Sequence, residues 1–220
     1  MELPEYLYND NPVDDLQFYF NGESLALAVK SMLQGDDAKV PLDEAFIWDG
    51  THTFSWLTAL SGYPRPEKVS EPLPADAYLA AAQANTDIIC SWVEGHPDTQ
   101  FKIWFPPYSI LYWDKAQREG TTEAILSALE YACGWLLSYE NVKVHSFLND
   151  RWTITNLELY ADHIHCSSRA TIKTAWEMNS GNWRILPEFY MEQIDELRQF
   201  VTGYDYARLY SWLDEPEQSP

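Results

Sequence analysis

Residues 101–147 decide the fold class, because two short apolar runs stand there on either side of a helix-forming stretch. The first run is F-K-I-W-F (101–105) and the second is V-K-V-H-S-F (142–147). Between them, T-E-A-I-L-S-A-L-E-Y-A-C-G-W-L-L-S-Y (122–139) has the spacing of a helix. The order strand, helix, strand predicts a βαβ unit with parallel strands and a right-handed crossover. We therefore expect an α/β fold, a three-layer α/β/α sandwich around a mainly parallel sheet.

The composition of the two runs predicts how each strand lies in its sheet. The run at 101–105 is almost wholly apolar, which is typical of a buried strand, and prolines follow it at once. The run at 142–147 alternates apolar and polar side chains, as a strand near a sheet edge does. At the start of the intervening helix, either Thr121 or Thr122 can act as the capping residue.

Further helices are expected on both sides of this unit. Residues 75–94 have a strong helical pattern that ends in a Gly-His-Pro sequence, and residues 23–33 have a shorter one. Toward the C-terminus, one helix is expected to begin near Ser167 or Ser168. A long amphipathic helix is expected after Pro187.

Composition divides the chain into four parts. We expect a lead-in and first helix at 1–36, and a long loop or insertion at 37–74, where Pro, Gly, Asp and Thr are frequent. The α/β core follows at 75–212, and residues 213–220 form a tail that frays.

Overall composition excludes several functional classes. Of the 220 residues, 46% are hydrophobic and 22% are charged, as in globular proteins that bury a full core. The formal net charge is −20, which repels nucleic acids and anionic membrane surfaces, so we expect no nucleic-acid partner. The start of the chain is acidic rather than basic and apolar, so it does not read as a signal peptide. No stretch approaches roughly 18 consecutive apolar residues, and we expect no membrane-spanning segment.

The three cysteines do not form a recognisable framework. Cys90, Cys133 and Cys166 are odd in number and far apart, and no C-x-x-C pair occurs. We expect Cys90 and Cys133 to be small core residues within helices.

Residues whose side chains can transfer protons or bind metals cluster at 161–166, in the sequence A-D-H-I-H-C. They follow a strand-like run, N-L-E-L-Y (156–160), and precede a predicted helix. Positions i and i+3 of a turn lie on the same side, so Asp162 and His165 can face one cleft. A carboxylate there can fix the imidazole tautomer, and histidine moves protons easily near neutral pH. His163 is expected to point away into solvent.

Two other interpretations of this stretch remain open. A metal site would use Asp162, His163, His165 and Cys166, with His145 or His52 arriving from elsewhere in the chain. In a purely structural interpretation, these residues are polar loop residues that connect two secondary-structure elements. We expect no bound metal and no cofactor.

The segment after the first strand supplies candidate ligand contacts. In parallel α/β sheets, ligands collect beyond the carboxyl ends of the strands, and W-F-P-P-Y-S-I-L-Y-W-D (104–114) begins at such an end. Tyr108 and Ser109 are the candidate substrate-binding residues in this segment. Ser109 lacks the flanking glycines of a nucleophile elbow.

Other aromatic and hydroxyl groups are weaker candidates for a functional site. Exposed aromatic rings can line a groove for a sugar polymer, although most such rings belong to cores. Hydroxyls beside His52 are expected to be turn or capping groups. The residues concerned are Trp48, Trp56, Tyr108 and Trp113 among the aromatics, and Thr51 and Ser55 among the hydroxyls.

From roughly Phe101 to Cys166 the chain resembles the C-terminal half of SGNH/GDSL-type hydrolases. The similarity lies in the ordered pattern F-P-P-Y-S, a strand, then N-L-x-x-Y-x-D-x-x-H. It is closest to the membrane-anchored bacterial branch that includes the D-alanyl-transfer proteins of cell-wall polymers. In that family the D-x-x-H motif supplies two members of a Ser-His-Asp triad, which implies these roles for Asp162 and His165.

The resemblance implies an esterase or O-acyltransferase that acts on an acylated polysaccharide or cell-wall polymer, outside the cytoplasm. The nucleophilic serine of the family stands in a G-x-S-like block after the first strand, and residues 1–36 contain no such block. We therefore expect a sandwich that is incomplete at its N-terminal edge, with turnover dependent on a nucleophile that the pattern does not show. The alternative is a catalytically inactive carbohydrate-binding or protein-interaction domain of the same fold.

Overall fold

The structure of this chain, a computed structural model, describes residues 54–214, with side chains up to 211. All of these residues belong to one compact unit, Phe46–Pro220. Several expectations fall outside the described residues: the helix at 23–33, the candidates Trp48, Thr51 and His52, and the tail from 215.

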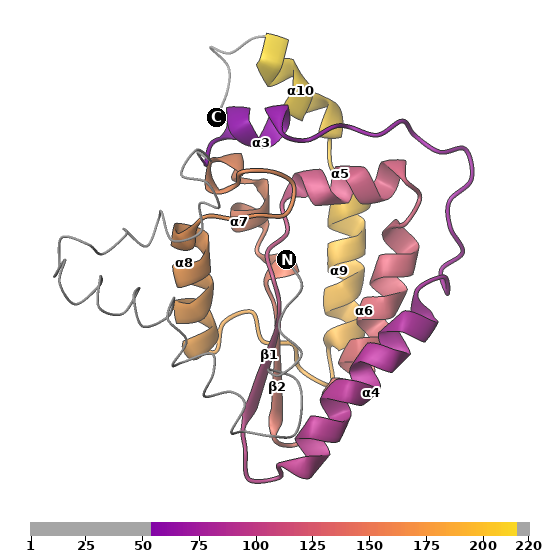
Figure 1. Cartoon of the computed structure of the whole chain (residues 1–220), viewed down its shortest axis with the longest axis vertical. Helices are drawn as coiled ribbons and strands as arrows, with labels where there is room; N and C mark the ends of the chain where they lie inside the picture. The colour runs from indigo at the N-terminus through magenta and orange to yellow at the C-terminus, as the bar shows by residue number, and fades with distance from the viewer. Residues whose placement is uncertain (1–53, 215–220) are drawn as a thin grey trace, which may run out of the picture. The chain divides into compact units, whose positions relative to one another are not determined.

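The described residues form helices around two short strands (Figure 1). The strands are β1 (Phe101–Phe105) and β2 (Val142–Ser146), and short 3-10 turns follow at η3 (Phe147–Asn149) and η4 (Leu157–Leu159). The α-helices are α3 (Trp56–Ser61), α4 (Leu79–Gly95), α5 (Ile110–Arg118), α6 (Thr122–Leu136), α7 (Arg151–Thr155), α8 (Ser168–Asn179), α9 (Tyr190–Gly203) and α10 (Tyr206–Asp214).

The predicted βαβ unit is confirmed in its pairing. β1 and β2 are parallel neighbours, in a register that runs from Phe101 opposite Val142 to Phe105 opposite Ser146. The crossover contains two helices rather than one, because α5 begins directly after the double-proline corner. Ser109 occupies the N-cap position of α5, where its extended backbone turns into the helix.

The burial of the two strands is the reverse of the prediction. Lys102 and Trp104 of β1 are exposed, whereas β2 is almost wholly buried. The cause is a neighbour from far along the chain: residues 183–185 run against the outer edge of β2. Their hydrogen bonds join Ser146 N to Trp183 O and Ile185 N to Val144 O, each at 2.9 Å. Because β2 lies between β1 and this segment, it is central rather than at an edge.

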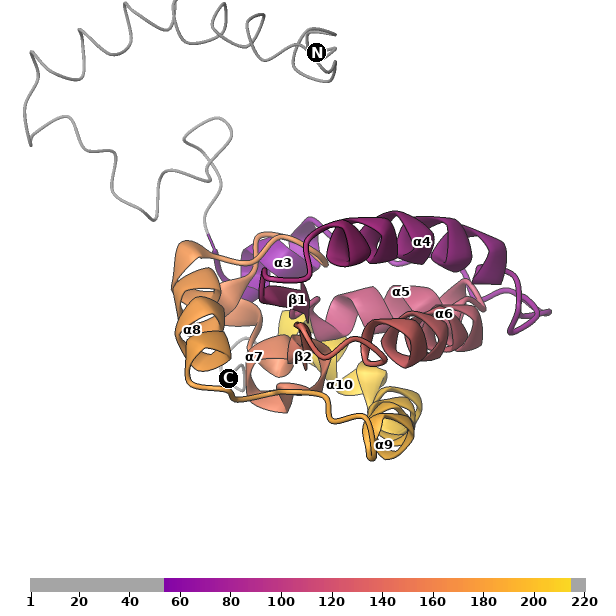
Figure 2. The same ribbon diagram turned by 90° about the horizontal axis from the view of Figure 1, so that it is seen from below.

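Three helices pack side by side on one side of the strands. α6 lies between α4 and α9 and contacts both, and α8 lies on the other side of the strands (Figures 1 and 2). Cys90 and Cys133 are buried in α4 and α6, as predicted. Burial raises the pKa of the Cys133 thiol to about 12, so this cysteine is an inert core residue. The described strands make a two-stranded parallel sheet, and the fold is α/β.

Local capping signals succeed at one helix and fail at another. Ser167 caps α8, where its hydroxyl accepts the hydrogen bond of Ala170 N. Thr121 occupies the N-cap position of α6, but its hydroxyl donates to Ala116 O in the preceding helix. The strand expected at 156–160 is wrong: Leu157–Leu159 form η4, and of these five residues only Tyr160 makes a β-bridge, to Cys166.

The segment expected as a long loop at 37–74 contains α3, and its later part runs along the end of α5. Two backbone hydrogen bonds hold it there, from Val69 N to Arg118 O and from Leu73 N to Gly120 O. Gly120 has a φ of 69°, and a Cβ at this position would lie 2.5 Å from the Cα of Pro72. Only glycine allows this backbone conformation and this close approach.

A buried carboxylate ties the same segment to the rest of the core. Asp114 of α5 accepts hydrogen bonds from Tyr63 Oη at 3.1 Å and from Arg65 Nε at 2.8 Å. Tyr210 Oη of α10 donates to the same carboxylate at 3.2 Å. These bonds join three parts of the chain that are remote in sequence.

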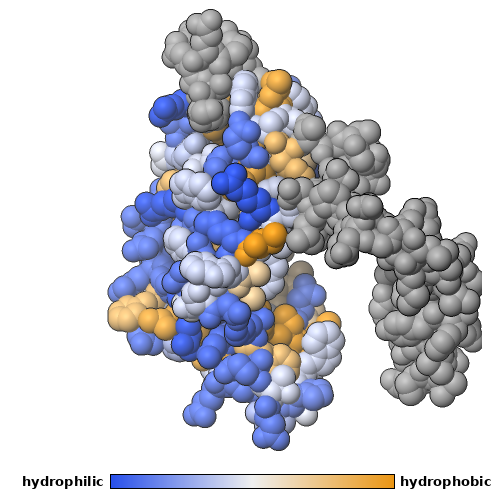
Figure 3. Space-filling view, turned by 90° about the vertical axis from the view of Figure 1, so that its left-hand side faces the viewer, coloured by the Kyte–Doolittle hydropathy of each residue, from blue (hydrophilic) through white to orange (hydrophobic). Residues whose placement is uncertain are grey.

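On the face of the molecule shown in Figure 3, hydrophobic residues form separate patches within a largely hydrophilic surface. Within residues 54–214, no helix is both long enough and apolar enough to cross a bilayer.

Candidate functional site

The loop between η4 and α8 carries the predicted acid–base residues, and backbone hydrogen bonds close it at its base. Ser167 N donates to Leu159 O at 2.7 Å, and Ala161 N donates to His165 O at 3.0 Å. The loop is therefore a closed turn, and its residues project from a fixed stem.

The structure brings Asp162 and His165 together. Asp162 Oδ2 lies 2.7 Å from His165 Nδ1. The other carboxylate oxygen, Oδ1, accepts the backbone N–H groups of Ile164 and His165, each at 2.7 Å. Each oxygen of the carboxylate thus has a defined partner, and the imidazole is held in one orientation.

The electrostatics of the pair favour a charged carboxylate. Burial alone would raise the pKa of Asp162, but the hydrogen bonds from His165 and Ile164 outweigh it and lower the pKa. The side chain of His165 is 45% exposed and that of Asp162 is 26% exposed. The imidazole therefore has an anionic partner behind it and a large surface open to a ligand.

The double-proline corner after β1 lies directly against this loop. Tyr160 Oη donates to Pro107 O at 2.6 Å, and Ser109 Oγ donates to His163 O at 2.9 Å. Ser109 has no exposed surface, so its hydroxyl positions the loop rather than contacting a ligand. Tyr108, the other predicted substrate contact, is half-buried, and its ring lies 4.7 Å from that of Tyr112.

A hollow of about 480 Å³ opens beside Asp162, with α3 as its far wall. Ser55 N donates to Tyr160 O at 3.2 Å, which anchors the start of α3 to the loop. Gly62 closes the other end, where an added Cβ would lie 3.4 Å from Ala161 O. Six residues line the hollow: Leu57, Thr58, Ser61, Gly62, Ala161 and Asp162.

The prediction for His163 is wrong. Its ring lies against Tyr63, with 5.7 Å between ring centroids, and its Nδ1 is buried without a partner among the described residues. Burial lowers its pKa. The loop turns here instead of staying extended, so alternate residues do not alternate between solvent and core.

The metal interpretation gains no support from the geometry. Within residues 54–214, no group of three or more His, Cys, Asp or Glu side chains converges closely enough to hold a metal ion. Cys166 is half-buried, and its Sγ lies 3.7 Å from Thr171 Oγ1 of α8.

The sequence did not predict that α3 forms one wall of the hollow beside Asp162. Ser61 is exposed and lines the hollow with Asp162, although 101 positions of sequence separate them. A local signal for the helix existed: Ser55 precedes W-L-T-A-L and accepts the hydrogen bond of Thr58 N at 3.1 Å. Its placement against the loop had no local signal.

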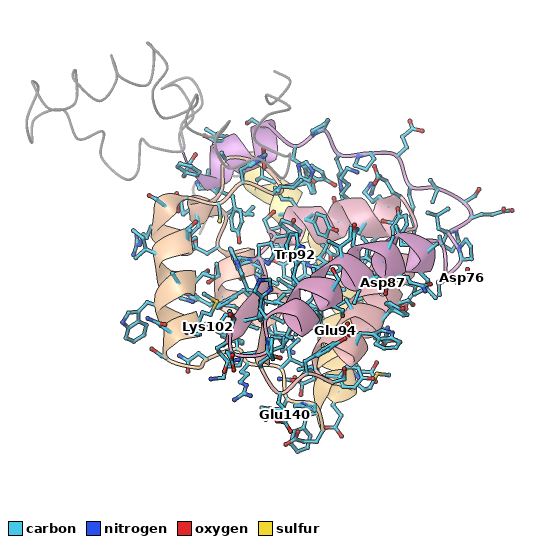
Figure 4. All side chains as sticks on the ribbon, turned by 60° about the horizontal axis from the view of Figure 1, so that its bottom comes forward. Asp76, Asp87, Trp92, Glu94, Lys102 and Glu140 are labelled. Atoms are coloured by element: carbon cyan, nitrogen blue, oxygen red, sulfur yellow. The ribbon has the colours of Figure 1, made fainter. Side chains whose placement is uncertain are left out.

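A second hollow, of about 520 Å³, lies at the opposite ends of the strands. Glu94 of α4 and Glu140, which precedes β2, line it, and both are labelled in Figure 4. Asp98 lines it as well. Tyr139 Oη donates to Glu94 Oε1 at 2.5 Å. The lining of this hollow holds carboxylates but no carboxylate–imidazole pair like the one that Asp162 forms with His165.

The arrangement at 161–165 can take up and release a proton beside an open hollow.

No protein-family model matches the sequence, and no curated protein or solved structure matches it significantly.

Proposed function

We propose that this chain carries the acid–base half of an SGNH-type active site, in an esterase or O-acyltransferase for acylated polysaccharides or cell-wall polymers. The observation that carries the proposal is the 2.7 Å contact between Asp162 Oδ2 and His165 Nδ1. The resemblance to the SGNH family, which implies triad roles for the same two residues, also supports the proposal. A three-layer α/β/α sandwich, of which the βαβ unit is one part, belongs to the same proposal.

The chemistry follows from the tautomer that the carboxylate selects. His165 donates Nδ1–H to Asp162, which leaves Nε2 as the basic nitrogen. Nε2 takes the proton of a serine hydroxyl as its oxygen attacks the ester carbonyl. The imidazolium then protonates the departing sugar oxygen. Water, or a second hydroxyl group, repeats these steps to release the acyl group.

The serine hydroxyls near the site differ in burial and in hydrogen bonding, and therefore in how readily each could act as the nucleophile. Ser109 is buried and bonded to His163 O, and Ser55 Oγ is engaged with Thr58. Ser61 lines the hollow with Asp162 and is exposed. Ser61 is therefore the described serine to test first.

Hydrolysis of a short aryl ester such as p-nitrophenyl butyrate, followed between about pH 6 and pH 9, tests the proposal. His165→Ala should lower kcat/KM at least about 1,000-fold, because the general base is lost. Ser61→Ala, assayed in parallel, decides whether that hydroxyl attacks the ester.

The matched control is His96→Ala. His96 is exposed at the end of α4, where its Nδ1 lies 2.8 Å from Trp92 O, and its removal should leave hydrolysis unchanged. Equal loss in both variants would contradict the proposal, and so would hydrolysis that survives in His165→Ala.

A catalytically inactive carbohydrate-binding domain is the second candidate, and exposed aromatic side chains favour it. Trp152 and Trp176, on α7 and α8, are 57% and 68% exposed. Flat exposed rings stack on sugars. Absence of hydrolysis by the unaltered chain throughout this pH range would favour this second function.

A further inference from the structure

Three cationic side chains lie together on one face of the strands. Lys102 of β1 and Lys143 of β2 are register partners, so their side chains leave the sheet on the same face, from strands about 4.8 Å apart. His145 follows Lys143 by two positions and shares that face, and Arg184 forms a β-bridge with His145. The three cations therefore lie around one imidazole ring.

The electrostatics agree with this grouping. Burial lowers the pKa of the His145 imidazole, and the charges of the three cations lower it further. His145 itself is buried, but Lys102 and Arg184 are exposed and Lys143 is half-buried. A molecule from solvent can therefore reach the charged ends of the cluster.

The cluster has no carboxylate partner. Within residues 54–214, none of the three cations forms an ion pair. Lys102 Nζ donates to Asn179 Oδ1 of α8 at 2.9 Å, which is a neutral acceptor, and Lys102 is labelled in Figure 4. Acidic residues outnumber basic ones by 34 to 14 in the whole chain, so carboxylates are not scarce.

This arrangement is unfavourable without an anion. Like charges directly opposite each other destabilise a pair of strands, and Lys102 and Lys143 are such a pair. Elsewhere in the fold, cations are neutralised by buried carboxylates: Arg65 pairs with Asp114 at 2.8 Å. A bound anion would neutralise the cluster in the same way.

The number and kind of donors favour a phosphate group. A guanidinium can donate two parallel N–H bonds to phosphate, and each ammonium adds a charge-assisted bond. A phosphate monoester offers three terminal oxygens and close to two negative charges, whereas a carboxylate offers two oxygens and one charge. The net charge of −20 repels an extended polyanion, so the ligand that fits is small.

We infer that Lys102, Lys143 and Arg184 bind the phosphate group of a small molecule. The inference goes beyond the proposed function and does not rest on it. Lys102 and Lys143 are the second residues of their strands, toward the amino ends. The loop of Asp162 lies instead against the double-proline corner, beyond the carboxyl end of β1.

The test is a titration of the ¹⁵N-labelled full chain with inorganic phosphate, at constant ionic strength and about pH 8, where phosphate carries close to two charges. The backbone amide resonances of Lys102, Lys143 and Arg184 should shift and saturate with a Kd of about 1 mM. Sodium chloride at matched ionic strength should give no saturable shift. Glucuronate, a carboxylate, should bind at least about tenfold more weakly than phosphate.

Glucose 6-phosphate distinguishes the two sources of a phosphate group. Trp104 is the register partner of His145, and its ring is 40% exposed, so it can stack on a sugar held at the cluster. Tighter binding of glucose 6-phosphate than of inorganic phosphate would identify a phosphorylated sugar as the ligand. Equal or weaker binding would identify inorganic phosphate itself.

Two arginine substitutions separate the cluster from general charge effects. Arg184→Gln should weaken phosphate binding at least about tenfold, because the two-pronged donor is lost. Arg169→Gln removes the same charge from an exposed position of α8, roughly 15 Å along the helix from Asn179, and should leave the affinity unchanged. The thermal unfolding temperature of Arg184→Gln without phosphate should not fall, since no ion pair is broken.

The outcomes separate this inference from the proposed function. Phosphate binding that is weakened in Arg184→Gln but kept in His165→Ala supports the cluster, whether or not the chain hydrolyses esters. No saturable shift, the same response to sodium chloride, equal affinity for glucuronate, or equal loss in Arg184→Gln and Arg169→Gln overturns it. Each of these results leaves the Asp162–His165 proposal untouched.

Discussion

Asp114 and Asp162 are both hydrogen-bonded carboxylates, but their partners come from different distances along the chain. The partners of Asp114 are Tyr63, Arg65 and Tyr210, which lie 49 to 96 positions away. The side chain of Asp114 is only 3% exposed. The partners of Asp162 lie within three positions, and one of them is an exposed imidazole.

This difference distinguishes a carboxylate that is bonded across the whole fold from one that is bonded within a single loop, and the proposed function gives the chemical role to the second. Asp114 joins α5, α10 and the segment after α3, so its bonds exist only when the whole unit is folded. The guanidinium of Arg65 has a raised pKa chiefly because of its hydrogen bond to Asp114. Asp162 fixes one loop and one imidazole, and its loss should leave the rest of the fold intact.

The largest expected effect is on activity, in Asp162→Asn. An asparagine can still accept the backbone N–H groups of Ile164 and His165, so the loop should keep its shape. The negative charge behind the imidazole is lost, and aryl-ester hydrolysis should fall about 1,000- to 10,000-fold. Steady-state kinetics measures this effect.

The thermal unfolding temperature of Asp162→Asn provides the check on its fold. It should fall by only a few degrees, in keeping with a change of about 1 kcal/mol. A large drop in unfolding temperature together with retained hydrolysis would reverse the roles assigned to the two carboxylates.

The second effect is on stability, in Asp114→Ala. Removing this carboxylate leaves Arg65 and two tyrosine hydroxyls without their acceptor in a mostly buried setting. The free energy of unfolding, measured in urea, should fall by about 3 kcal/mol. Glu119→Ala is the matched control beside the same helix, because it breaks only the partly exposed pair with Lys115. That pair should contribute about 0.3–0.5 kcal/mol, and similar losses in the two variants would show that Asp114 is no structural tie.

The parts of the fold that the sequence predicts are those with local signals. β1 is found at its predicted residues, and α4 and α9 follow from apolar spacing. The burial of β2 could not be predicted, because residues 183–185 cover its edge and nothing near β2 signals them. The number of strands in the sheet could not be predicted from the two strand patterns either, because segments remote in sequence can add to the sheet.

The candidate site divides in the same way. The proximity of Asp162 and His165 follows from their spacing within one turn, while their chemical role remains a prediction. The hollow beside them is built by α3, and the burial of His163 depends on contact with Tyr63. Both are contacts over some 100 positions of sequence, which local periodicity does not encode.

Buried and exposed imidazoles should also differ in their effect on stability, because a buried histidine makes the free energy of unfolding depend on pH. Burial lowers the pKa of His145, and the charges of Arg184, Lys102 and Lys143 lower it further, although the bond to Asn182 O opposes them. The unfolded chain therefore binds a proton more readily than the folded chain. Stability should fall as pH drops below about 6.5, by at most about 1.4 kcal/mol per pH unit for one proton.

Urea unfolding at several pH values between about 5 and 7.5 measures this slope. His145→Gln should reduce it, and the remainder should come from His163, whose pKa burial also lowers. His96→Gln removes an exposed imidazole and serves as the control. An unchanged slope in His145→Gln would show that this ring is not protonated on unfolding.

The smallest expected effect concerns the contact that ties the Asp162 loop to the fold from a distance. Ser109 Oγ donates to His163 O across 54 positions of sequence, and Ser109→Ala leaves that carbonyl without this donor. Stability should fall by about 1 kcal/mol. Ser91→Ala, which removes an exposed hydroxyl bonded within its own helix, should change stability by less than about 0.5 kcal/mol. If the loop depends on this tie, ester hydrolysis in Ser109→Ala should also fall several-fold. Full hydrolysis with reduced stability would instead show that the short-range bonds of Asp162 position His165 by themselves.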